Sequence, residues 1–482
     1  MKRITFFFII VIHCGAFSLS AQSGLTTHFL GRNPYANIEN PALNLDMKGY
    51  FGFPAFSNFN LTLTNTAFHY KNLFDLDKEG YPTLVKPNKF VDKLSQNNNW
   101  LNFSLNEEIL GFGFRTNFLF FSLSYRLKLE TFTNFSKDIF GFFVYGNMHY
   151  SGADNPARMK ANLSLNLYQE VSLNVQATIG KRLFIAARPK FLMGLTNITT
   201  DKLNANIYTN PEDLSIAADY NLDMMATLAF PQLTVDHDKF NFNSNYRHRL
   251  LSQNRGFAID LGAIFEISRH FGVGLAVNDL GFINWNSPAV RIRSSLGDQG
   301  AFYRDGQFFF NGLSGEQISE LSNKETRNQF FDTLQAYFPI DLENASMGKK
   351  MLTTKVNIEG YFKLNDHHKF ILLFQNYINP HFYYPKLTIA YNGRFGRVLD
   401  LAVHYSIMPS NYGNLGLGLG LELGPVYLYL ATENLISLCS PLNGNTLNAQ
   451  IGFCFKIKES RKRIKTDDDN LINTQEENIQ EP

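Results

Sequence analysis

Between residues 161 and 179 the chain alternates apolar and polar side chains with a period of two. The odd positions from Ala161 to Ile179 are Ala, Leu, Val or Ile except Gln169, whereas the even positions from Asn162 to Thr178 are polar. Successive side chains of a β-strand point to opposite faces, so this segment has one apolar and one polar side. It is longer than a typical strand of a globular protein. The pattern predicts an all-β fold, a transmembrane antiparallel β-barrel whose strands turn apolar residues to lipid and polar residues to the lumen.

The N-terminus predicts how the chain reaches a membrane. Lys2 and Arg3 precede an apolar run from Phe6 to Ile12, and small residues follow up to Ala21. This order indicates a secretory signal peptide over residues 1–21. No later segment has the run of about eighteen apolar residues that a membrane-spanning helix needs. An exported chain with alternating strands is expected in the bacterial outer membrane, with lipid as its surrounding partner.

Composition and motifs exclude several classes of function. The chain has 44 Lys and Arg against 42 Asp and Glu, so no nucleic-acid-binding surface is indicated. The run from Gly312 to Gly315 lacks the pattern of a nucleophile elbow, and no His-Glu-x-x-His zinc motif occurs. We therefore predict no enzyme, no cofactor and no metal site. Cys439 and Cys454, which remain after signal removal, are too few for a disulfide scaffold, and their pairing stays open.

Alternating segments recur along the chain and predict about fourteen strands, with a range of twelve to sixteen. Six linkers between them are tight and fall after every second strand, whereas the other connections are mostly longer. This rhythm predicts periplasmic tight turns, periplasmic termini and long extracellular loops, the longest over residues 66–100, 132–158, 197–255 and 294–351. Residues 203–208 and 214–224 also alternate, so another hairpin would raise the count to sixteen. The predicted strands cover residues 49–65, 101–114, 117–131, 159–179, 182–196, 256–267, 271–293, 352–364, 369–378, 385–394, 397–407, 414–423, 426–433 and 446–457.

Two segments flank the barrel predicted over residues 49–457. Residues 22–48 contain Asn33-Pro34-Tyr35 and Asn40-Pro41-Ala42 and are too rich in turn formers for a strand. Residues 458–482 mix Lys and Arg with Asp and Glu, which predicts a disordered, charged periplasmic tail. The glycines of Gly416-Leu417-Gly418-Leu419-Gly420 leave one face of a strand without side chains. That empty inner face predicts space in the lumen for a plug or a ligand.

The motif Asn40-Pro41-Ala42, shortly after a signal peptide and before a Phe-rich barrel, resembles the FadL-type outer-membrane transporters of long-chain fatty acids and other hydrophobic compounds. In that superfamily the N-terminal segment folds inward as a hatch. The resemblance implies that residues 22–48 form a plug and that the barrel is a conduit for a hydrophobic small molecule.

Three further segments are similar to an uncharacterised outer-membrane barrel family of Bacteroidota, a domain of unknown function. They are Phe90–Trp100 (FVDKLSQNNNW), Asp279–Trp285 (DLGFINW) and Gly424–Leu435 (GPVYLYLATENL). The same segments resemble barrels related to PorV, a component of type IX secretion. This second resemblance implies envelope proteins as partners and transfers no catalytic or binding residue.

Charged residues on the inner faces of the strands are the candidate site. The bland interpretation is that opposite charges pair across the wall and hold a plug. The functional interpretation is a polar conduit or an anchor for the acidic head group of a ligand. Three functions are weighed: a conduit for hydrophobic small molecules, a non-transporting component of an envelope machine, and a barrel hydrolase whose Ser/His/acid cluster the sequence does not show. The candidate lumen-facing residues are Glu170, Arg182, Arg188, Lys190, Asp260, Glu266, Asp400, His404 and Glu422.

Overall fold

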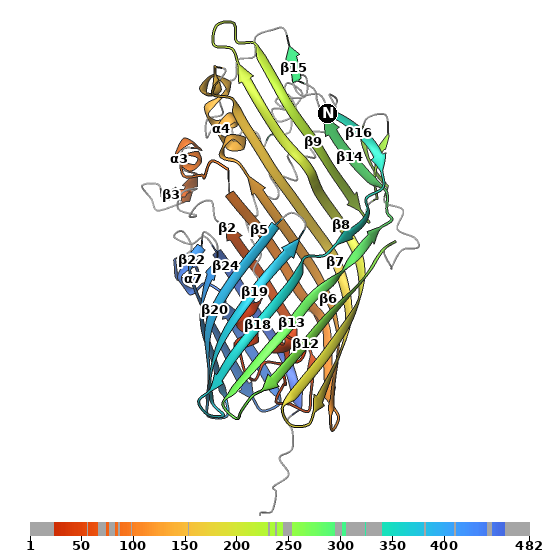
Figure 1. Cartoon of the computed structure of the whole chain (residues 1–482), viewed down its shortest axis with the longest axis vertical. Helices are drawn as coiled ribbons and strands as arrows, with labels where there is room; N and C mark the ends of the chain where they lie inside the picture. Colours follow the sequence, from red (N-terminus) through yellow and green to blue (C-terminus); the bar gives the residue numbers. More distant parts are fainter. Residues whose placement is uncertain are drawn as a thin grey trace, which may run out of the picture.

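A computed structural model describes the barrel and the segment that precedes it (Figure 1). The predicted signal peptide and the predicted charged tail lie outside the described residues. Those residues are 24–54, 56–65, 74–76, 82–84, 87–97, 99–152, 154–229, 232–236, 239–243, 253–294, 301–304, 323, 340–379, 382–408, 411–440 and 446–457.

Fourteen antiparallel strands close into a barrel, which confirms the predicted fold class and strand number. The first strand is formed by β1 (Gly49–Gly52) and β2 (Asn58–Asn65) together, and both pair with the last strand, β24 (Thr446–Ile457). The eighth strand, β18 (Thr354–Lys363), is preceded by β17 (Gly348–Met351), which pairs with the same neighbour. The other strands are β5 (Asn99–Arg115), β6 (Leu119–Phe135), β7 (Ala157–Ile179), β8 (Leu183–Thr209), β12 (Asn254–Glu266), β13 (Phe271–Trp285), β19 (His368–Asn379), β20 (Phe382–Phe395), β21 (Leu399–Met408), β22 (Asn411–Leu423) and β23 (Val426–Thr432).

The six predicted tight linkers all lie at one end of the barrel, which we call the tight-turn end; β19 and β20, and β21 and β22, are also joined by only two residues, at the other end. Each of them joins strands that pair directly, such as β7 with β8 and β22 with β23. Gly180 and Gly424 take φ angles of 61° and 66° in two of these turns, a left-handed conformation that glycine adopts without strain. Gly49 and Ile457 are paired residues, so the barrel begins and ends at this same end.

The first strand is interrupted, in contrast to the continuous strand predicted over residues 49–65. Gly52 pairs with Cys454 and Phe59 pairs with Ile451, so the first strand uses seven residues where its neighbour uses three. The first strand therefore has four more residues than β24 between these two pairs, and the Phe453 N–H of β24 donates to the Phe56 carbonyl at 2.9 Å. The alternation of apolar and polar residues could not reveal this interruption, because the same alternation continues from Asn58 onward in β2.

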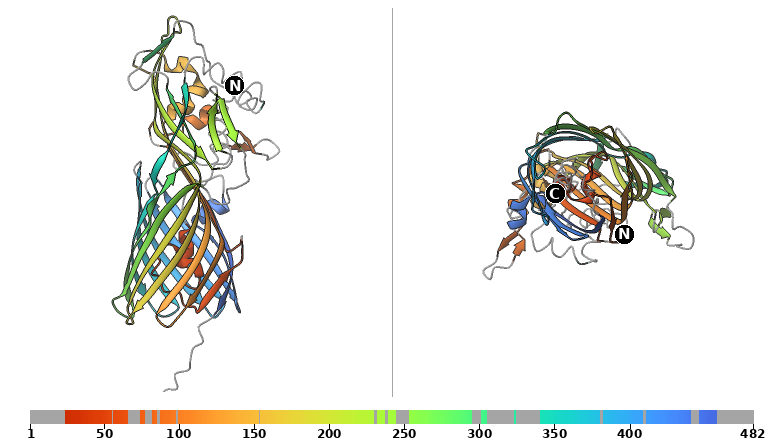
Figure 2. Two further views of the ribbon diagram at one scale, coloured as in Figure 1. Left: turned by 90° about the vertical axis from the view of Figure 1, so that its right-hand side faces the viewer. Right: turned by 90° about the horizontal axis from the view of Figure 1, so that it is seen from below.

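Several strands continue beyond the barrel as a sheet extension (Figure 2). The upper part of β8 pairs with β9 (Ile216–Leu228), β9 pairs with β14 (Ala289–Ser294) and β15 (Ala301–Arg304), and β14 pairs with β16 (Ile340–Ala345). The alternating residues 203–208 and 214–224 therefore form a hairpin, but outside the barrel wall. The strand predicted over 271–293 is wrong, since β13 ends at Trp285 and β14 joins the extension.

Small hairpins and short helices lie at the same end as the sheet extension, except α2 (Leu25–Phe29) and η1 (Pro34–Ile38), which precede the first strand. Two small hairpins are formed by β3 (Phe74–Leu76) with β4 (Pro82–Leu84) and by β10 (Gln232–Asp236) with β11 (Lys239–Asn243). None of the helices in the described part of the chain is long and apolar enough to cross a membrane. The helices are α2 (Leu25–Phe29), η1 (Pro34–Ile38), α3 (Pro87–Val91), α4 (Lys137–Tyr145), η3 (Asn147–Tyr150) and α7 (Leu435–Cys439).

Large apolar side chains cover the outside of the barrel wall. On β7, Leu173 is 43% exposed while its neighbour Asn174 is buried on the inner face. The same alternation leaves Phe257 and Leu261 of β12 exposed and buries Asp260 between them. A charge at the middle of a lipid-facing surface costs about 2–4 kcal/mol for Lys or Arg, so this apolar band is suited to a bilayer.

Candidate functional site in the lumen

Residues 24–48, the N-terminal segment, lie inside the lower half of the barrel (Figures 1 and 2). Two asparagines set its turns: Asn33 Oδ1 accepts the N–H of Tyr35 at 3.1 Å and caps η1, and Asn40 Oδ1 accepts the N–H of Ala42 at 3.0 Å. These are the turn formers that excluded a strand here. The segment folds back on itself through such local hydrogen bonds.

Apolar side chains of the N-terminal segment form one cluster with the inner wall. Phe29 and Tyr35 are buried in it together with Tyr50, Phe120 and Tyr427 of the strands. The other segment members of the cluster are Leu25, Leu30, Ala36, Ala42, Leu45 and Met47. The lower lumen is thus packed in the manner of a protein core.

Wall glycines make room for the segment. A Cβ atom at Gly418 would lie 2.9 Å from Thr26 Cγ2, and one at Gly262 would lie 2.9 Å from two ring carbons of Pro41. Both contacts are tighter than side chains tolerate. The empty face of the β22 glycine run is therefore occupied, at Gly418, by α2 of the N-terminal segment.

Polar contacts fix both ends of the segment. The Thr26 N–H donates to Glu433 Oε1 at 2.9 Å, and the Thr26 hydroxyl lies 2.8 Å from His404 Nε2. Further along, His28 Nε2 lies 3.0 Å from Glu359 Oε2, and the Arg32 N–H donates to Asp400 Oδ2 at 2.8 Å.

The motif Asn40-Pro41-Ala42 is held by wall amides and a carboxylate. Asn174 donates to the Pro41 carbonyl and Gln176 to the Ala42 carbonyl, while the Asn40 amide donates to Glu359.

Glu39 is the most heavily bonded residue at the top of the segment. Its carboxylate lies 2.9 and 3.0 Å from Lys355 Nζ and accepts a hydrogen bond from Gln375 at 2.9 Å. Its carbonyl accepts hydrogen bonds from Asn278 and Asn357 at 2.8 and 2.7 Å. One residue therefore ties the segment to β13, β18 and β19.

Above the segment, four carboxylates and four cations form a charge network on β5, β6, β7, β8, β12 and β13. Glu170 lies 2.9 Å from Lys128 Nζ, 3.4 Å from Arg126 Nη1 and 3.6 Å from Lys190 Nζ. The remaining pairs are Glu108 with Arg126 at 2.9 Å, Asp260 with Lys190 at 2.7 Å and with Arg188 at 3.2 Å, and Asp279 with Lys190 at 2.6 Å and with Lys128 at 3.5 Å. The charges balance, as buried ionic groups require.

A β-bulge turns Asp279 into this network. The register moves from Ile259 opposite Leu280 to Leu261 opposite Val277, so Asp260 faces two residues of β13. Asp279 has a φ of 58°, and its N–H donates to Asp260 Oδ1 at 2.8 Å. Strict alternation would place Asp279 on the outer face with Val273 and Leu275. The bulge therefore moves a carboxylate from the outer face of the wall to the lumen.

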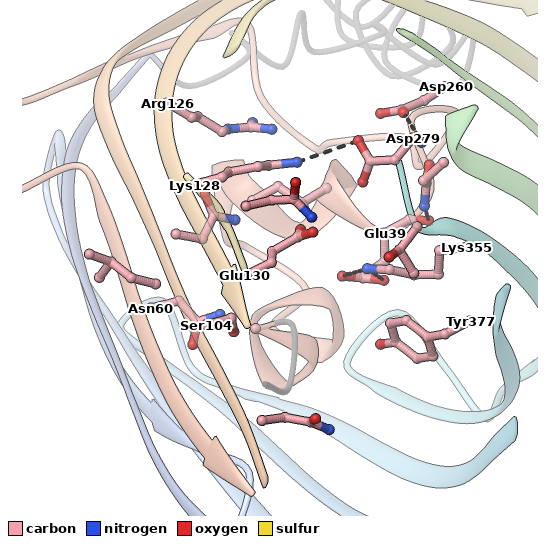
Figure 3. A pocket seen from close by; sticks show the side chains of 18 of the residues that line it. Glu39, Asn60, Ser104, Arg126, Lys128, Glu130, Asp260, Asp279, Lys355 and Tyr377 are labelled. Carbon is pink, nitrogen blue, oxygen red and sulfur yellow. Dashed lines mark hydrogen bonds and ion pairs between the residues drawn. The ribbon is translucent and has the colours of Figure 1, made fainter. Parts of the chain in front are cut away.

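The network borders a cavity of about 150 Å³ (Figure 3). Thr27, Ile38 and Glu39 of the N-terminal segment form part of its boundary, and the barrel wall forms the rest. Its apolar lining residues are few, among them Ile38, Leu105, Phe132 and Met408. The charged residues of the lining are Glu39, Arg126, Lys128, Glu130, Arg188, Lys190, Asp260, Asp279, Lys355 and Lys386.

The structure separates the predicted lumen residues into three groups. Glu170, Arg188, Lys190 and Asp260 meet in the charge network, and Arg188 also donates to the Asn37 and Ile38 carbonyls of the segment. Asp400, His404 and Glu422 lie beside the segment, where Glu422 is 3.0 Å from Lys456 and 4.0 Å from Arg32. Glu266 is half-buried near the tight-turn end and lies 2.6 Å from Lys363 Nζ.

Arg182 corrects the prediction. It is exposed in the turn between β7 and β8, because β8 begins only at Leu183. Its backbone carbonyl accepts the Glu266 N–H at 2.8 Å, and its side chain does not join Arg188 and Lys190. Arg182 and Arg188 are both at even positions, which predicted that their side chains share the inner face. The alternation of a strand does not extend into a turn, so this prediction is wrong for Arg182.

Other lumen residues were missed. Arg126, Lys128 and Glu130 share the inner face of β6 with Ser122 and Ser124, and the period of two in that strand could have found them. Asp279 and Glu39 carried no such signal, since one depends on a bulge and the other on how a non-strand segment folds. Within the described residues no group of three His, Cys, Asp or Glu side chains is placed to hold a metal ion.

Comparisons with known proteins give one sequence family and several barrels. The model of a family described as "Family of unknown function (DUF5723)" matches residues 41–433. No curated protein matches the chain.

Among solved structures, the toluene transporter TodX of Pseudomonas putida is 9% identical with a TM-score of 0.41. The alignment covers 92% of this chain and 99% of the TodX chain. A FadL homologue of Pseudomonas aeruginosa is 8% identical with a TM-score of 0.42 and the same coverage. The toluene transporter TbuX of Ralstonia pickettii is 9% identical with a TM-score of 0.39, covering 92% of this chain and all of its own.

Proposed function

The chain belongs to this family of unknown function, and we propose that it is an outer-membrane conduit for a small molecule whose lumen is closed by the N-terminal segment. In this proposal the tight turns and both termini face the periplasm and the sheet extension faces the outside. The segment acts as the hatch. The apolar outer band of the wall and the predicted signal peptide support the location.

One observation carries the proposal: the cavity is bounded jointly by the wall and by the upper face of the N-terminal segment. A ligand in this cavity would touch Glu39 and Thr27, which belong to the segment, and Lys355 and Lys190, which belong to the wall. Below the cavity, the segment fills the lumen with packed apolar side chains. Passage towards the tight-turn end therefore requires the segment to move, and ligand contact is coupled to that movement.

The resemblance to FadL-type transporters implies a hydrophobic cargo. The lining of the cavity is mixed, because ten of its residues are charged while Ile38, Leu105, Phe132, Tyr377 and Met408 are aliphatic or aromatic. A hydrocarbon there would desolvate charged groups without replacing their hydrogen bonds, which is unfavourable. Uptake of radiolabelled laurate by deletion and complemented strains tests the hydrophobic form of the proposal, and equal uptake by both strains would reject it.

A disulfide staple tests the hatch. Thr26→Cys combined with Gly418→Cys places two thiols where a Cβ at position 418 lies 2.9 Å from the Thr26 side chain, with Cys439→Ser removing the exposed native thiol. We expect oxidised protein to block solute entry into proteoliposomes and dithiothreitol to restore it. Each single-cysteine variant serves as the control. Entry that is unaffected by oxidation would show that the segment is not the hatch, and no entry in either state would reject a conduit.

The sheet extension favours a second candidate, a non-transporting component of an envelope machine such as type IX secretion. Its strands carry their own apolar cluster, which includes Ile198, Met224, Val290 and Ile292. A core of this kind, beyond the barrel, gives a protein partner a rigid surface. Affinity capture of the full chain from crosslinked cells, compared with a variant lacking residues 216–228, tests it.

A further inference from the structure

We infer that the cavity binds a small hydrophilic solute that carries a primary ammonium group. This inference names the cargo class of the proposed conduit and rests on that proposal. It starts from Glu130, a carboxylate that the charge network does not include.

Glu130 lies in the middle of one cavity wall (Figure 3). On the inner face it stands in one cross-strand row with Ser104 of β5 and Asn166 of β7. Its Oε1 accepts a hydrogen bond from the Tyr168 hydroxyl at 3.4 Å. In the part of the chain that the structure describes, no Lys, Arg or His nitrogen lies within the 4.0 Å ion-pair distance of Glu130. Glu130 therefore faces the cavity with no cation of the described structure in ion-pair contact, and Lys128 and Lys355 act on it only from a longer distance.

Two amide oxygens in this wall lack a hydrogen-bond donor among the described residues. Asn102 Oδ1 and Asn106 Oδ1 are buried and make no hydrogen bond within the described structure. Both residues line the cavity, and they flank Ser104 on β5 at the positions opposite Phe132 and Lys128. An ammonium group has three N–H donors and no acceptor, so it matches a carboxylate with carbonyl oxygens beside it.

The cations of the cavity are already paired, which disfavours an anionic ligand. Lys355 is held by Glu39 at 2.9 Å, Lys190 by Asp279 at 2.6 Å and Lys386 by Glu433 at 3.3 Å. An anion would have to displace one of these carboxylates, whereas an ammonium group gains Glu130 without breaking a pair. Hydroxyl groups on the same solute would meet the remaining wall of Asn60, Ser104, Ser164 and Thr353.

The cavity volume sets the size of the solute. About 150 Å³ corresponds to roughly ten water molecules when one water needs about 10–15 Å³ in this measure. A monosaccharide has a comparable number of non-hydrogen atoms. Glucosamine, glucose and glucuronate are therefore matched probes, since they share a ring and differ in charge.

Binding of these three sugars to the full chain in detergent micelles, measured by titration calorimetry, tests the inference. We expect glucosamine to bind at least about tenfold more tightly than glucose, because a charge-assisted hydrogen bond to Glu130 is added. Glu130→Gln should remove this preference. Glu343→Gln, which removes a carboxylate paired with Arg293 on the sheet extension, should leave it unchanged. Equal affinity for glucosamine and glucose, or a preference for glucuronate, would overturn the inference.

The binding assay needs no movement of the N-terminal segment, so its outcome is separate from that of the conduit. Preferential binding of glucosamine without entry into proteoliposomes would reject the conduit and keep the binding site. Entry of glucose and glucosamine at equal rates, without a binding preference, would reject the ammonium site and keep the conduit. Heat-modifiable migration of Glu130→Gln on gels verifies that the variant barrel is folded.

Discussion

In the lower half of the lumen the N-terminal segment buries an apolar cluster beside hydrogen bonds to residues such as Asp400, whereas in the upper half it meets charges around a cavity. Below, Phe29 and Tyr35 are buried among wall aromatics. Above, Glu39 binds Lys355, and Arg188 binds two carbonyls of the segment. Each fully buried large apolar side chain stabilises by about 1.5–3 kcal/mol, while a buried ion pair gains little net free energy over its desolvation cost.

This difference gives the two contacts different roles. Apolar packing anchors the segment and has no ligand that could replace it. The ionic contacts lie at the boundary of the cavity, where a bound solute would lie beside them. The upper part of the segment is thus the part that we expect to respond first, and three substitutions test that order.

The largest effect is expected from Phe29→Ala in the lower lumen. Truncating a buried Phe costs about 3–5 kcal/mol through lost packing and the cavity that is left. Hydrogen exchange of the full chain should then accelerate at amides throughout residues 24–48. The matched control is Phe118→Ala, whose ring is 62% exposed in a tight turn and should leave exchange of the segment unchanged. Slow exchange in both variants would contradict anchoring by packing.

An intermediate and more local effect is expected from Lys355→Met in the upper lumen. The substitution removes the charged donor from Glu39, and one charged hydrogen-bonded pair of this kind contributes about 1.5–3 kcal/mol. Exchange should accelerate around Glu39 but not in α2. The double variant with Glu39→Gln should recover part of the loss, because no unpaired carboxylate remains. Uniform acceleration across the segment would remove the distinction between its two halves.

The smallest effect is expected from Glu266→Gln near the tight-turn end. Glu266 and Lys363 form a partly exposed pair at 2.6 Å, and exposed pairs contribute about 0–1 kcal/mol. The thermal midpoint of barrel unfolding, followed by gel mobility, should shift by at most a few degrees. The thermal midpoint of Phe29→Ala is measured in the same way for comparison. If Glu266→Gln lowers the midpoint as much as Phe29→Ala does, this ion pair and not the apolar cluster holds the lower lumen.

The sequence predicted the wall well because each strand of a closed barrel has one inner and one outer face, which imposes a period of two. Leu173 and Asn174 are separated by period two alone, and the six tight linkers follow from the residues between alternating segments. The same logic failed where the backbone departs from a regular strand. Arg182 lies in a turn, the first strand is interrupted between Gly52 and Asn58, and Asp279 is turned inward by an extra residue. Each departure depends on the register of a neighbouring strand, which a single sequence does not display.

The candidate site was predictable only in part for the same reason. Glu170, Arg188, Lys190 and Asp260 follow from inner-face parity on three strands, and Arg126, Lys128 and Glu130 could have followed from it on a fourth. That Glu170 is in ion-pair contact with cations while Glu130 is not depends on side chains that converge from different strands. The partner of Lys355 is Glu39, which lies more than 300 positions earlier in the chain.

By itself, the sequence predicted a barrel of about fourteen strands with one apolar and one polar face on each strand, because a period of two over such long segments leaves few alternatives. The tertiary structure decided what the lumen contains. The N-terminal segment, the charge network and the cavity arise from contacts between residues distant in sequence. Such contacts are set by barrel closure and strand register, which no local pattern encodes.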